Sequence, residues 1–251
     1  MRDETKILRS TLTAAVAGGP LHAGPVFAGP FHTPGDPADA PYSYGRSHNP
    51  TWTELEHAIG EMESGPGFEA GTRLFSSGMA ACTAVMGAVL RPGDVVVMPP
   101  NGYFTARMLV QDYFAAMGVR LRVGATAGAL QAGLLEGAKL LWIETPSNPT
   151  MVVADIAALC EAAHAAGVLV AADNTTATPL GQKPLALGAD FSLASDAKSM
   201  TGHSDLLLGH VSVKDAELLA KIDRWRTLTG GIVGPMEAWL ALRSIATLPL
   251  R

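Results

Sequence analysis

The sequence predicts an α/β protein with a mainly parallel sheet that helices cover on both faces. From residue 71 onward, short apolar segments alternate with segments of helical periodicity. The apolar segments, such as VVVM, LLWI and VLVAA, are almost uninterrupted apolar runs, which is typical of strands buried on both faces. Strands that alternate with helices indicate parallel pairing through right-handed crossovers.

Length and composition indicate a globular protein with a large core. The chain has 251 residues, of which 48% are hydrophobic and 16% charged, and this length allows one large α/β domain or two small ones. The net charge of −5 is scattered, and no basic run suggests a nucleic-acid partner. No apolar stretch approaches the roughly 18 residues of a membrane helix, and the charged N-terminus lacks a secretory signal. Cys82 and Cys160 lack C-x-x-C spacing, so we expect a reducing cytoplasm.

Residues 1–50 differ from the rest of the chain. They are rich in Gly, Pro and His and show neither helical nor strand periodicity. So long an irregular arm is unusual in a compact domain unless it is functional or docks elsewhere. A capping box, Thr51-x-x-Glu54, then predicts a helix that begins at Thr51. The apolar face of this helix is formed by Leu55, Ala58, Ile59 and Met62.

The alternating region extends from residue 71 to residue 246. We expect strands over residues 71–75, 94–98, 119–123, 139–144, 168–173, 190–195 and 206–213. We expect helices over residues 79–90, 103–117, 155–166, 215–227 and 235–246. No repeat, low-complexity segment or interdomain linker interrupts this order.

Chemically useful residues follow several of the expected strands, and ligands bind such sheets outside the carboxyl ends of the strands. Asp173 ends the strand VLVAAD, and Lys198 follows the strand FSLAS. A lysine in a low dielectric is an amine nucleophile that can form a Schiff base, and an aspartate can keep a pyridine nitrogen protonated. As single residues, both are more often ordinary solvated side chains. Their convergence with Ser77 and Glu144 at one edge of the sheet favours a site.

A second pattern predicts an anion site at a helix start. Ser77, Gly78 and Met79 connect a strand to a helix, where free N–H groups beside a glycine favour a bound phosphate. A serine that only caps the helix is the alternative. The sequence contains neither G-x-G-x-x-G after a strand nor G-x-x-x-x-G-K-[ST], which disfavours dinucleotide and nucleoside-triphosphate sites. A single phosphate is the better match.

Three further residues are candidates for cofactor contacts. Tyr103 begins a helix after a Pro-Pro-Asn-Gly turn and could stack on an aromatic cofactor. Tyr44 and Arg46 lie in the arm, and the planar fork of arginine suits phosphate. Taken singly, they are more often a packed aromatic residue and solvated loop residues. The histidines show no metal-ligand spacing, and no G-x-S-x-G is present.

Six motifs, in order along nearly the whole chain, resemble those of one family. They are YSYGRSHNPTWTELEHAI, SSGMAA, ETPSNP, ADNTTATP, SDAKSMTGHSD and LALRSIATLPLR. They are similar to the Y-x-R-x-x-N-P-T segment, the phosphate-binding turn, and the E-[ST]-P-x-N-P, D-N-T-x-x-[TS]-P, S-x-x-K-x-x-x-G-H-S-D and L-x-L-R-G-L-x-T-L-x-x-R motifs of the pyridoxal-phosphate (PLP) enzymes of cysteine and methionine metabolism. The chain is identified as resembling that family, which includes cystathionine γ-lyase and γ-synthase.

The resemblance implies a fold and an assembly. Residues 51–251 would form the PLP-binding large domain of a fold-type I PLP-dependent transferase. Residues 1–50 would form an arm that reaches a neighbouring subunit, so that the active site of a homo-oligomer, a dimer or a tetramer, is shared between subunits. The family's small C-terminal domain, which supplies an arginine for the substrate carboxylate, is expected to be absent.

The resemblance also implies a role for each candidate residue. Lys198 would form the Schiff base and later shuttle protons, Asp173 would pair with the ring nitrogen, and Tyr103 would stack on the ring. Asn148 would lie near the cofactor's O3′ or the substrate carboxylate. The phosphate would be bound by the turn of Ser77, Gly78 and Met79, by the hydroxyl of Ser195, and by Tyr44 and Arg46 from the neighbouring subunit.

Two local departures from the family pattern stand out. Ala197 replaces the threonine that usually precedes the lysine, and the lost hydrogen bond to phosphate is worth about 1–3 kcal/mol. Ser195 with Thr175 or Thr176, or water, could compensate. The segment Tyr103-Phe104-Thr105-Ala106 replaces Y-G-[GC]-T, and the missing cysteine disfavours a methionine γ-lyase.

The activity implied by the resemblance is that of a cytoplasmic, PLP-dependent carbon–sulfur lyase of transsulfuration. Its substrate would be a sulfur amino acid, with α,γ-elimination from cystathionine giving cysteine, 2-oxobutanoate and ammonia. Replacement at Cγ of an O-acylated homoserine, as in cystathionine γ-synthase, stays open. A non-catalytic PLP-binding remnant also stays open, whereas an aminotransferase of the same fold is disfavoured by the Y-x-R arm and the G-H-S-D segment.

Overall fold

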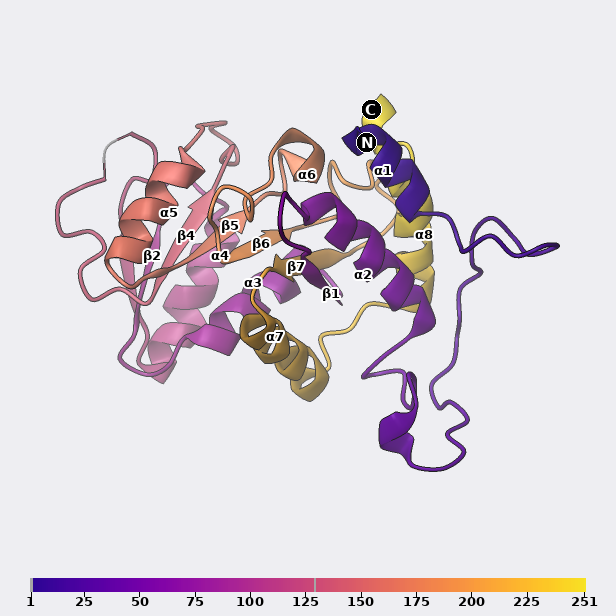
Figure 1. Ribbon diagram of the computed structural model, residues 1–251. Helices are drawn as coiled ribbons and strands as arrows, with labels where there is room; N and C mark the ends of the chain where they lie inside the picture. Colours follow the sequence, from indigo (N-terminus) through magenta and orange to yellow (C-terminus); the bar gives the residue numbers. More distant parts are fainter. Residues whose placement is uncertain (1, 129) are drawn as a thin grey trace.

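One seven-stranded sheet forms the centre of the computed structural model, which describes residues 2–128 and 130–251 (Figure 1). The strands lie in the order β1-β7-β6-β5-β4-β2-β3. Their bounds are Gly71–Phe75 (β1), Val95–Met98 (β2), Arg120–Val123 (β3), Leu140–Glu144 (β4), Leu169–Asp173 (β5), Phe191–Ala194 (β6) and Gly209–Val213 (β7). The expected strands are therefore all present, and the mainly parallel α/β fold class is confirmed.

Strand direction brings several carboxyl ends to one edge of the sheet. Strands β3, β2, β4, β5 and β6 pair in parallel, whereas β7 is antiparallel to both β6 and β1. Strand β1 consequently points the same way as the parallel group. In this register Glu144 lies opposite Asp173, which in turn lies opposite Leu193. The loops that follow β1, β4, β5 and β6 therefore meet at a single edge.

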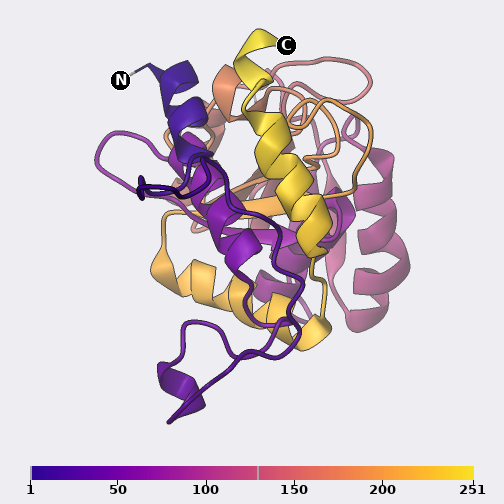
Figure 2. The ribbon, with the colours of Figure 1, turned by 90° about the vertical axis from the view of Figure 1, so that its right-hand side faces the viewer.

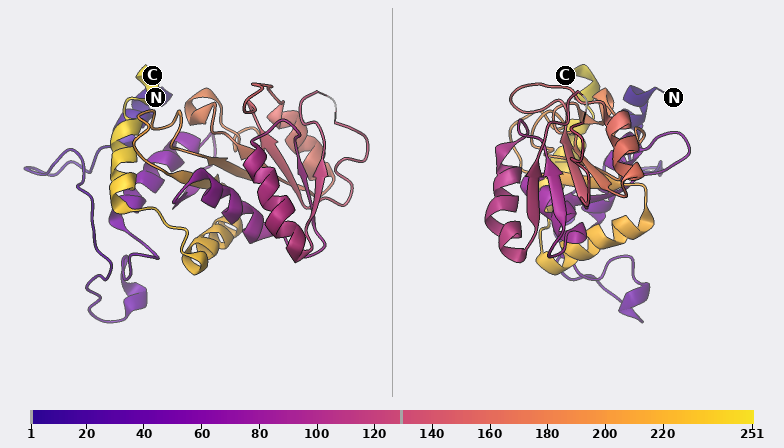
Figure 3. Two further views of the ribbon diagram at one scale, coloured as in Figure 1. Left: turned by 180° about the vertical axis from the view of Figure 1, so that it is seen from behind. Right: turned by 90° about the vertical axis from the view of Figure 1, so that its left-hand side faces the viewer.

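Helices cover both faces of the sheet. Helices α3 (Gly78–Val89), α4 (Phe104–Leu109) and α7 (Ala216–Thr229) pack on one face through a shared apolar cluster. Helix α5 (Ile156–Ala165) packs on the other face, where α2 (Pro50–Glu63) and α8 (Pro235–Ile245) form a separate cluster. The right-hand view of Figure 3 shows α4 and α5 on opposite sides of the strands. The remaining elements are α1 (Asp3–Ser10), α6 (Thr178–Gly181), and the short turns η1 (Pro37–Asp39), η2 (Val110–Phe114), η3 (Ala115–Met117) and η4 (Leu248–Leu250).

The prediction of a wholly irregular arm over residues 1–50 is wrong at its beginning. Residues Asp3–Ser10 form helix α1, and Ile7 is only 1% exposed in the cluster that α2 and α8 line. Acidic residues in the first turn and Arg9 in the last turn complement the helix dipole. One buried side chain docks this short helix, and no sequence period shows so small an apolar face. Residues 11–49 are mostly irregular as predicted, and Figures 1 and 2 show them looping away from the body.

The start of α2 is set by a local cap that differs from the expected capping box. The cap is Asn49, whose side-chain oxygen accepts the N–H of Thr51, and the helix begins at Pro50. The hydroxyl of Thr51 instead accepts the N–H of Val26 at 2.9 Å, while the Asn49 amide donates to the Val26 carbonyl. These bonds tie the arm to the body.

Two other boundaries differ from expectation. The helix expected over residues 103–117 is α4 followed by a π-helical turn, η2, and a 3₁₀ turn, η3, that ends at Gly118 with φ +90°. The strand expected over residues 206–213 begins only at Gly209. Within residues 2–128 and 130–251, no helix has both the length and the apolar character needed to cross a bilayer.

Replacement of Ile7 by alanine tests the docking of α1. We expect Ile7→Ala to lower the free energy of unfolding by about 2–5 kcal/mol, because it opens a cavity in the α2–α8 cluster. Leu8→Ala is the matched control, since Leu8 lies in the same helix but is 51% exposed, and its effect should stay within about 0.5 kcal/mol. Urea denaturation measures both. Equal effects of the two variants would contradict a docked α1.

Candidate active site

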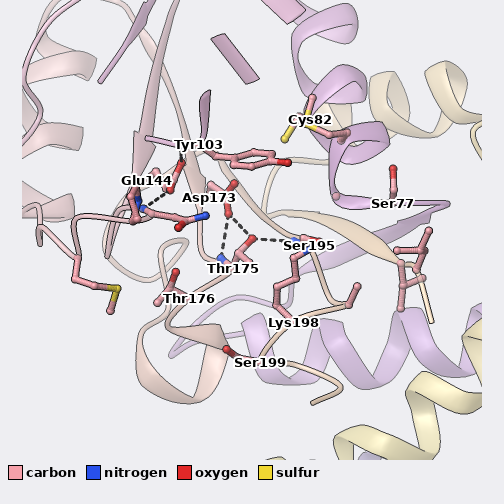
Figure 4. A pocket seen from close by; sticks show the side chains of 18 residues that line it. Ser77, Cys82, Tyr103, Glu144, Asp173, Thr175, Thr176, Ser195, Lys198 and Ser199 are labelled. Carbon is pink, nitrogen blue, oxygen red and sulfur yellow. Dashed lines mark hydrogen bonds between the residues drawn. The ribbon is translucent and has the colours of Figure 1, made fainter. Parts of the chain in front are cut away.

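A cavity of about 420 Å³ opens where the carboxyl ends of β1, β4, β5 and β6 meet (Figure 4). Every predicted site residue except Tyr44 and Arg46 lines this cavity. The lining residues that were predicted are Ser77, Gly78, Met79, Tyr103, Asn148, Asp173, Ser195 and Lys198. In the view of Figure 4, Tyr103 and Lys198 lie on opposite sides of the cavity with Asp173 between them. The fold thus gathers residues that are up to 121 positions apart in the chain.

Asp173 is held in one orientation by the loop that follows β5. Its Oδ1 accepts the N–H of Thr175 at 3.0 Å and the hydroxyl of Thr175 at 2.6 Å. Burial raises the pKa of Asp173, whereas the two bonds from Thr175 and the charge of His210 lower it. Thr175 also accepts the N–H of Ser195 at 2.8 Å. Thr175, which the sequence suggested only as a substitute phosphate ligand, therefore links the acid to the lysine turn.

Lys198 lies on the turn that follows β6, and its Nζ donates to Ser195 Oγ at 3.1 Å. The expectation that a low dielectric surrounds this amine is wrong for the chain itself, because Lys198 is exposed at the cavity wall. The turn that carries it is nevertheless ordered by the backbone bonds Lys198 N–H to Ser195 O (3.2 Å) and Gly202 N–H to Lys198 O (2.8 Å).

The predicted phosphate turn is both a helix cap and a cluster of free donors. Ser77 Oγ accepts the N–H of Ala80 at 3.1 Å and caps α3. The N–H groups of Gly78 and Met79 lie in the first turn, where no intrahelical acceptor exists. A Cβ on Gly78 would lie 2.4 Å from Ser195 Cβ, so only glycine lets α3 approach the lysine turn. Gly209 has the same role on the other side, because a Cβ there would lie 2.4 Å from the Ser77 carbonyl oxygen.

Glu144 is a site residue that the sequence analysis noted only as a strand end. It lies beside Asp173 in the sheet, and its carboxylate accepts the N–H groups of Tyr103 at 2.5 Å and Asn148 at 2.7 Å. Burial and then the charge of Asp173 raise the pKa of Glu144 to about 7. Its position at the end of LLWIE was the available signal, whereas its partners lie in loops that no local pattern connects.

Cys82 also lines the cavity, on α3, and was not predicted there. Burial raises the pKa of its thiol well above the usual value, with further contributions from Asp173 and Glu144, so the thiol stays neutral. Among the described residues, no group of three or more His, Cys, Asp or Glu side chains is arranged to hold a metal ion.

Tyr44 and Arg46 lie away from this cavity in the same chain. They line a separate hollow with Trp52 and the loop before α8, and the Arg46 guanidinium lies 5.5 Å from the centroid of the Tyr44 ring. Arg46 also donates to the carbonyl of Thr227. Their predicted role belongs to a site in a neighbouring subunit, and it stays a prediction.

The family description "Cys/Met metabolism PLP-dependent enzyme" matches residues 28–251. The chain belongs to this family. A Streptomyces coelicolor protein provisionally named a cystathionine gamma-lyase is 56% identical over 99% of this chain and 63% of its own length. The cystathionine gamma-lyase of Bacillus subtilis is 39% identical over 84% of this chain and 55% of its own length.

Solved structures of the family share the fold. A crystal structure of cystathionine gamma-synthase from Xanthomonas oryzae pv. oryzae, in complex with aminoacrylate and cysteine, superposes with a TM-score of 0.91 at 34% identity. The match covers 100% of this chain and 64% of that chain. The fold-type I assignment is therefore confirmed, and the chain spans between 55% and 64% of the length of these relatives.

The residues of the cavity fit PLP, the cofactor of the family. The cavity offers a primary amine at Lys198, a carboxylate at Asp173 and free N–H groups at the start of α3, which match the aldehyde, the ring nitrogen and the phosphate. The missing hydroxyl at Ala197 is not replaced by Thr175, whose proton goes to Asp173. Figure 4 shows Thr176 and Ser77 at opposite ends of the cavity. Ser195 is therefore the hydroxyl that lies toward the α3 turn.

Replacement of Glu144 by glutamine tests the raised pKa. Since the folded chain takes up a proton on Glu144 between its ordinary pKa of 4.5 and about 7, stability from this group is complete below 4.5 and is lost as the pH rises through 7. We expect the free energy of unfolding of Glu144→Gln, relative to the parent, to increase from pH 5 to pH 8.

Urea denaturation at both pH values measures this difference. Glu161→Gln, at an exposed position on α5, is the control and should show the same difference from the parent at pH 5 and pH 8. A pH-independent difference for Glu144→Gln would show that its carboxyl titrates normally.

Proposed function

We propose that this chain is the PLP-binding part of a lyase for sulfur amino acids that catalyses α,γ-elimination from cystathionine to cysteine, 2-oxobutanoate and ammonia. The observation that carries the proposal is the cavity in which Lys198, Asp173 and the start of α3 meet. Two relatives named as cystathionine gamma-lyases support the reaction type. Because the chain covers 63% and 55% of those relatives, the activity of the whole protein rests on this proposal and not on the match alone.

Lys198 and Asp173 have complementary tasks in this proposal. When bound, PLP supplies an electron sink for the carbanion that forms at the substrate Cα. Lys198 Nζ would hold the cofactor through its aldehyde carbon, and as a free amine it would accept the proton from Cα. Asp173 Oδ2 would keep the ring nitrogen protonated, since Thr175 already occupies Oδ1.

The remaining residues bind, orient and exclude water. Gly78 and Met79 would bind the phosphate through their N–H groups. Ser77 and Ser195, which line the same part of the cavity, would also contact it. Tyr103 would stack on the ring from the side opposite Lys198. Glu144 would hold Tyr103 and Asn148 in register through their backbone N–H groups.

Cystathionine γ-synthase activity is the second candidate. It is supported by the likeness to the Xanthomonas oryzae gamma-synthase at a TM-score of 0.91. Both reactions need the same lysine and acid. They differ in the last step, because the lyase reaction ends with hydrolysis to the keto acid and ammonia, whereas the synthase reaction ends with addition of a thiol at the substrate Cγ. A third candidate, a PLP-binding chain without catalysis of its own, needs only the cavity.

Replacement of Lys198 by alanine tests the cofactor site. After addition of PLP, the parent chain should show a visible absorbance band and Lys198→Ala should lack it, because the primary amine is lost. Lys221→Ala is the matched control, as Lys221 is an exposed lysine on α7 outside the cavity. Release of keto acid from cystathionine favours the lyase, whereas a coloured protein that releases none leaves the synthase and the non-catalytic binding chain as candidates. A colourless parent chain would overturn the proposed site.

We also propose that the chain works as a homo-oligomer in which Tyr44 and Arg46 reach the phosphate of a neighbouring subunit. Both side chains are exposed, and they lie where the arm of residues 11–49 returns to the body beside the loop before α8. In this proposal the binding partner of the arm is a second copy of the chain. The proposed setting is a reducing cytoplasm, which suits the two free, buried thiols of Cys82 and Cys160.

Mixing two inactive variants tests the shared site. Chains carrying Arg46→Ala and Lys198→Ala, mixed under conditions of subunit exchange, should recover about one quarter of the parental release of keto acid from cystathionine, because each mixed dimer has one intact site. Lys198→Ala mixed with Asp173→Asn is the control. Both of these residues line the same cavity of one chain, so that mixture should recover nothing. Failure of the first mixture to exceed the control would contradict a shared site.

A further inference from the structure

A cluster of ionisable residues is fully buried behind the turn that carries Lys198. It consists of Glu63 at the end of α2, His210 on β7 and Asp196 in the turn after β6, each with 0% exposure. His210 Nδ1 lies 2.8 Å and 3.0 Å from the two carboxylate oxygens of Asp196, and His210 Nε2 lies 3.3 Å from Glu63 Oε1. Ser192 on β6 donates to the same oxygen of Glu63 at 2.9 Å.

This cluster is a poor device for stability alone. Burial of each charge costs several kcal/mol, and well-packed apolar residues of the same volume are often as stable or more stable. The cluster is also incompletely satisfied, because Glu63 Oε2 has no hydrogen-bond partner among the described residues. We therefore expect the cluster to serve by fixing the position of the chain segments that it connects, and not by adding stability.

Asp196 is the member that connects the cluster to the proposed cofactor site. It lies between Ser195, which lines the cavity against Gly78, and Lys198. Its backbone is bound on both sides, since its N–H donates to Leu208 O at 3.0 Å and its carbonyl accepts the N–H and the hydroxyl of Thr201 at 3.1 Å and 2.7 Å. Its carboxylate then anchors this turn to β7 through His210.

The anchor acts from the face of the sheet opposite α3. Along β7, Val211 and Val213 pack in the cluster with α3 and α7, so His210 and Ser212 point to the other face, toward α2. The carboxylates of Asp196 and Glu63 raise the pKa of His210 to about 10 despite its burial, and the resulting cation also favours the ionised form of Asp173. The His210 side chain thus affects both the position of the turn that carries Lys198 and the ionisation of Asp173.

We propose that Glu63, His210 and Asp196 are positioning residues that fix the Ser195–Lys198 turn against the start of α3 for cofactor binding. None of the three lines the cavity, so none is a catalytic residue. The inference rests on the proposed cofactor site for its binding readout. The rigidity of the turn can be measured without cofactor.

Two conservative variants and one matched control test the proposal. Asp196→Asn keeps the volume of the side chain, His210→Asn keeps a polar but smaller side chain, and both remove the charged contact. Ser212→Ala is the control, because Ser212 is also fully buried on the same face of β7 and loses only its 2.7 Å hydrogen bond to Thr72. Each variant is purified as the full chain, and thermal unfolding reports its stability.

Amide hydrogen exchange of residues 195–202 is the decisive measurement on the chain without cofactor. We expect His210→Asn and Asp196→Asn to speed exchange in this segment at least about tenfold relative to Ser212→Ala, with the double variant no faster than the single ones because the pair acts as a unit. Titration with PLP should show a dissociation constant raised by about tenfold or more, which is the effect seen when the groups that orient metal ligands are replaced.

The outcomes separate this inference from the proposed function. If the parent chain fails to bind PLP, the proposed function fails, whereas faster exchange in the variants still supports the positioning role. If the parent binds PLP and the three variants show equal exchange and equal affinity, the cluster only stabilises the fold and the inference is overturned.

Discussion

The first turn of α3 packs against the turn that carries Lys198 so closely that position 78 has no room for a side chain. A Cβ there would lie 2.4 Å from Ser195, and one on Gly209 would lie equally close to the Ser77 carbonyl. Two free N–H groups, a hydroxyl and an amine are thereby brought around one small volume. The helices, the crossovers and the direction of β6 all have to place these two segments within van der Waals distance. The close approach is thus the constraint on which the cavity depends.

The second feature of the site is a concentration of negative charge at the ends of β4 and β5. Glu144 and Asp173 are neighbours in the register, and burial raises the pKa of both carboxyl groups. Each is held by donors of its own, from Tyr103 and Asn148 in one case and from Thr175 in the other. Such an arrangement favours a ligand that brings a proton or a positive charge to this edge, as a protonated pyridine ring does.

Several features of this site could be predicted from the sequence for an identifiable physical reason. In a parallel sheet the carboxyl ends of strands share an edge, so Asp173, Lys198 and Ser77 could be brought together from their positions after apolar runs. The same argument noted Glu144 but not its role, because its partners lie in two separate loops. The same argument predicted a desolvated lysine, yet Lys198 is exposed. Its exposure could not be predicted because the residues that form the cavity walls come from distant segments, and no local pattern describes how they pack.

By itself, the sequence determined the order of strands and helices, the family, and which polar residues follow which strand, because these depend on short-range periodicity and on local motifs. Only the tertiary structure decided that α1 docks through Ile7 and that the hydroxyl of Thr51 accepts the N–H of Val26 instead of capping α2. The tertiary structure also decided that His210 joins Asp196 to Glu63, 147 residues away from His210 in the chain. These contacts join segments far apart in the chain, and their energies depend on burial and on partners that only the folded sheet brings together.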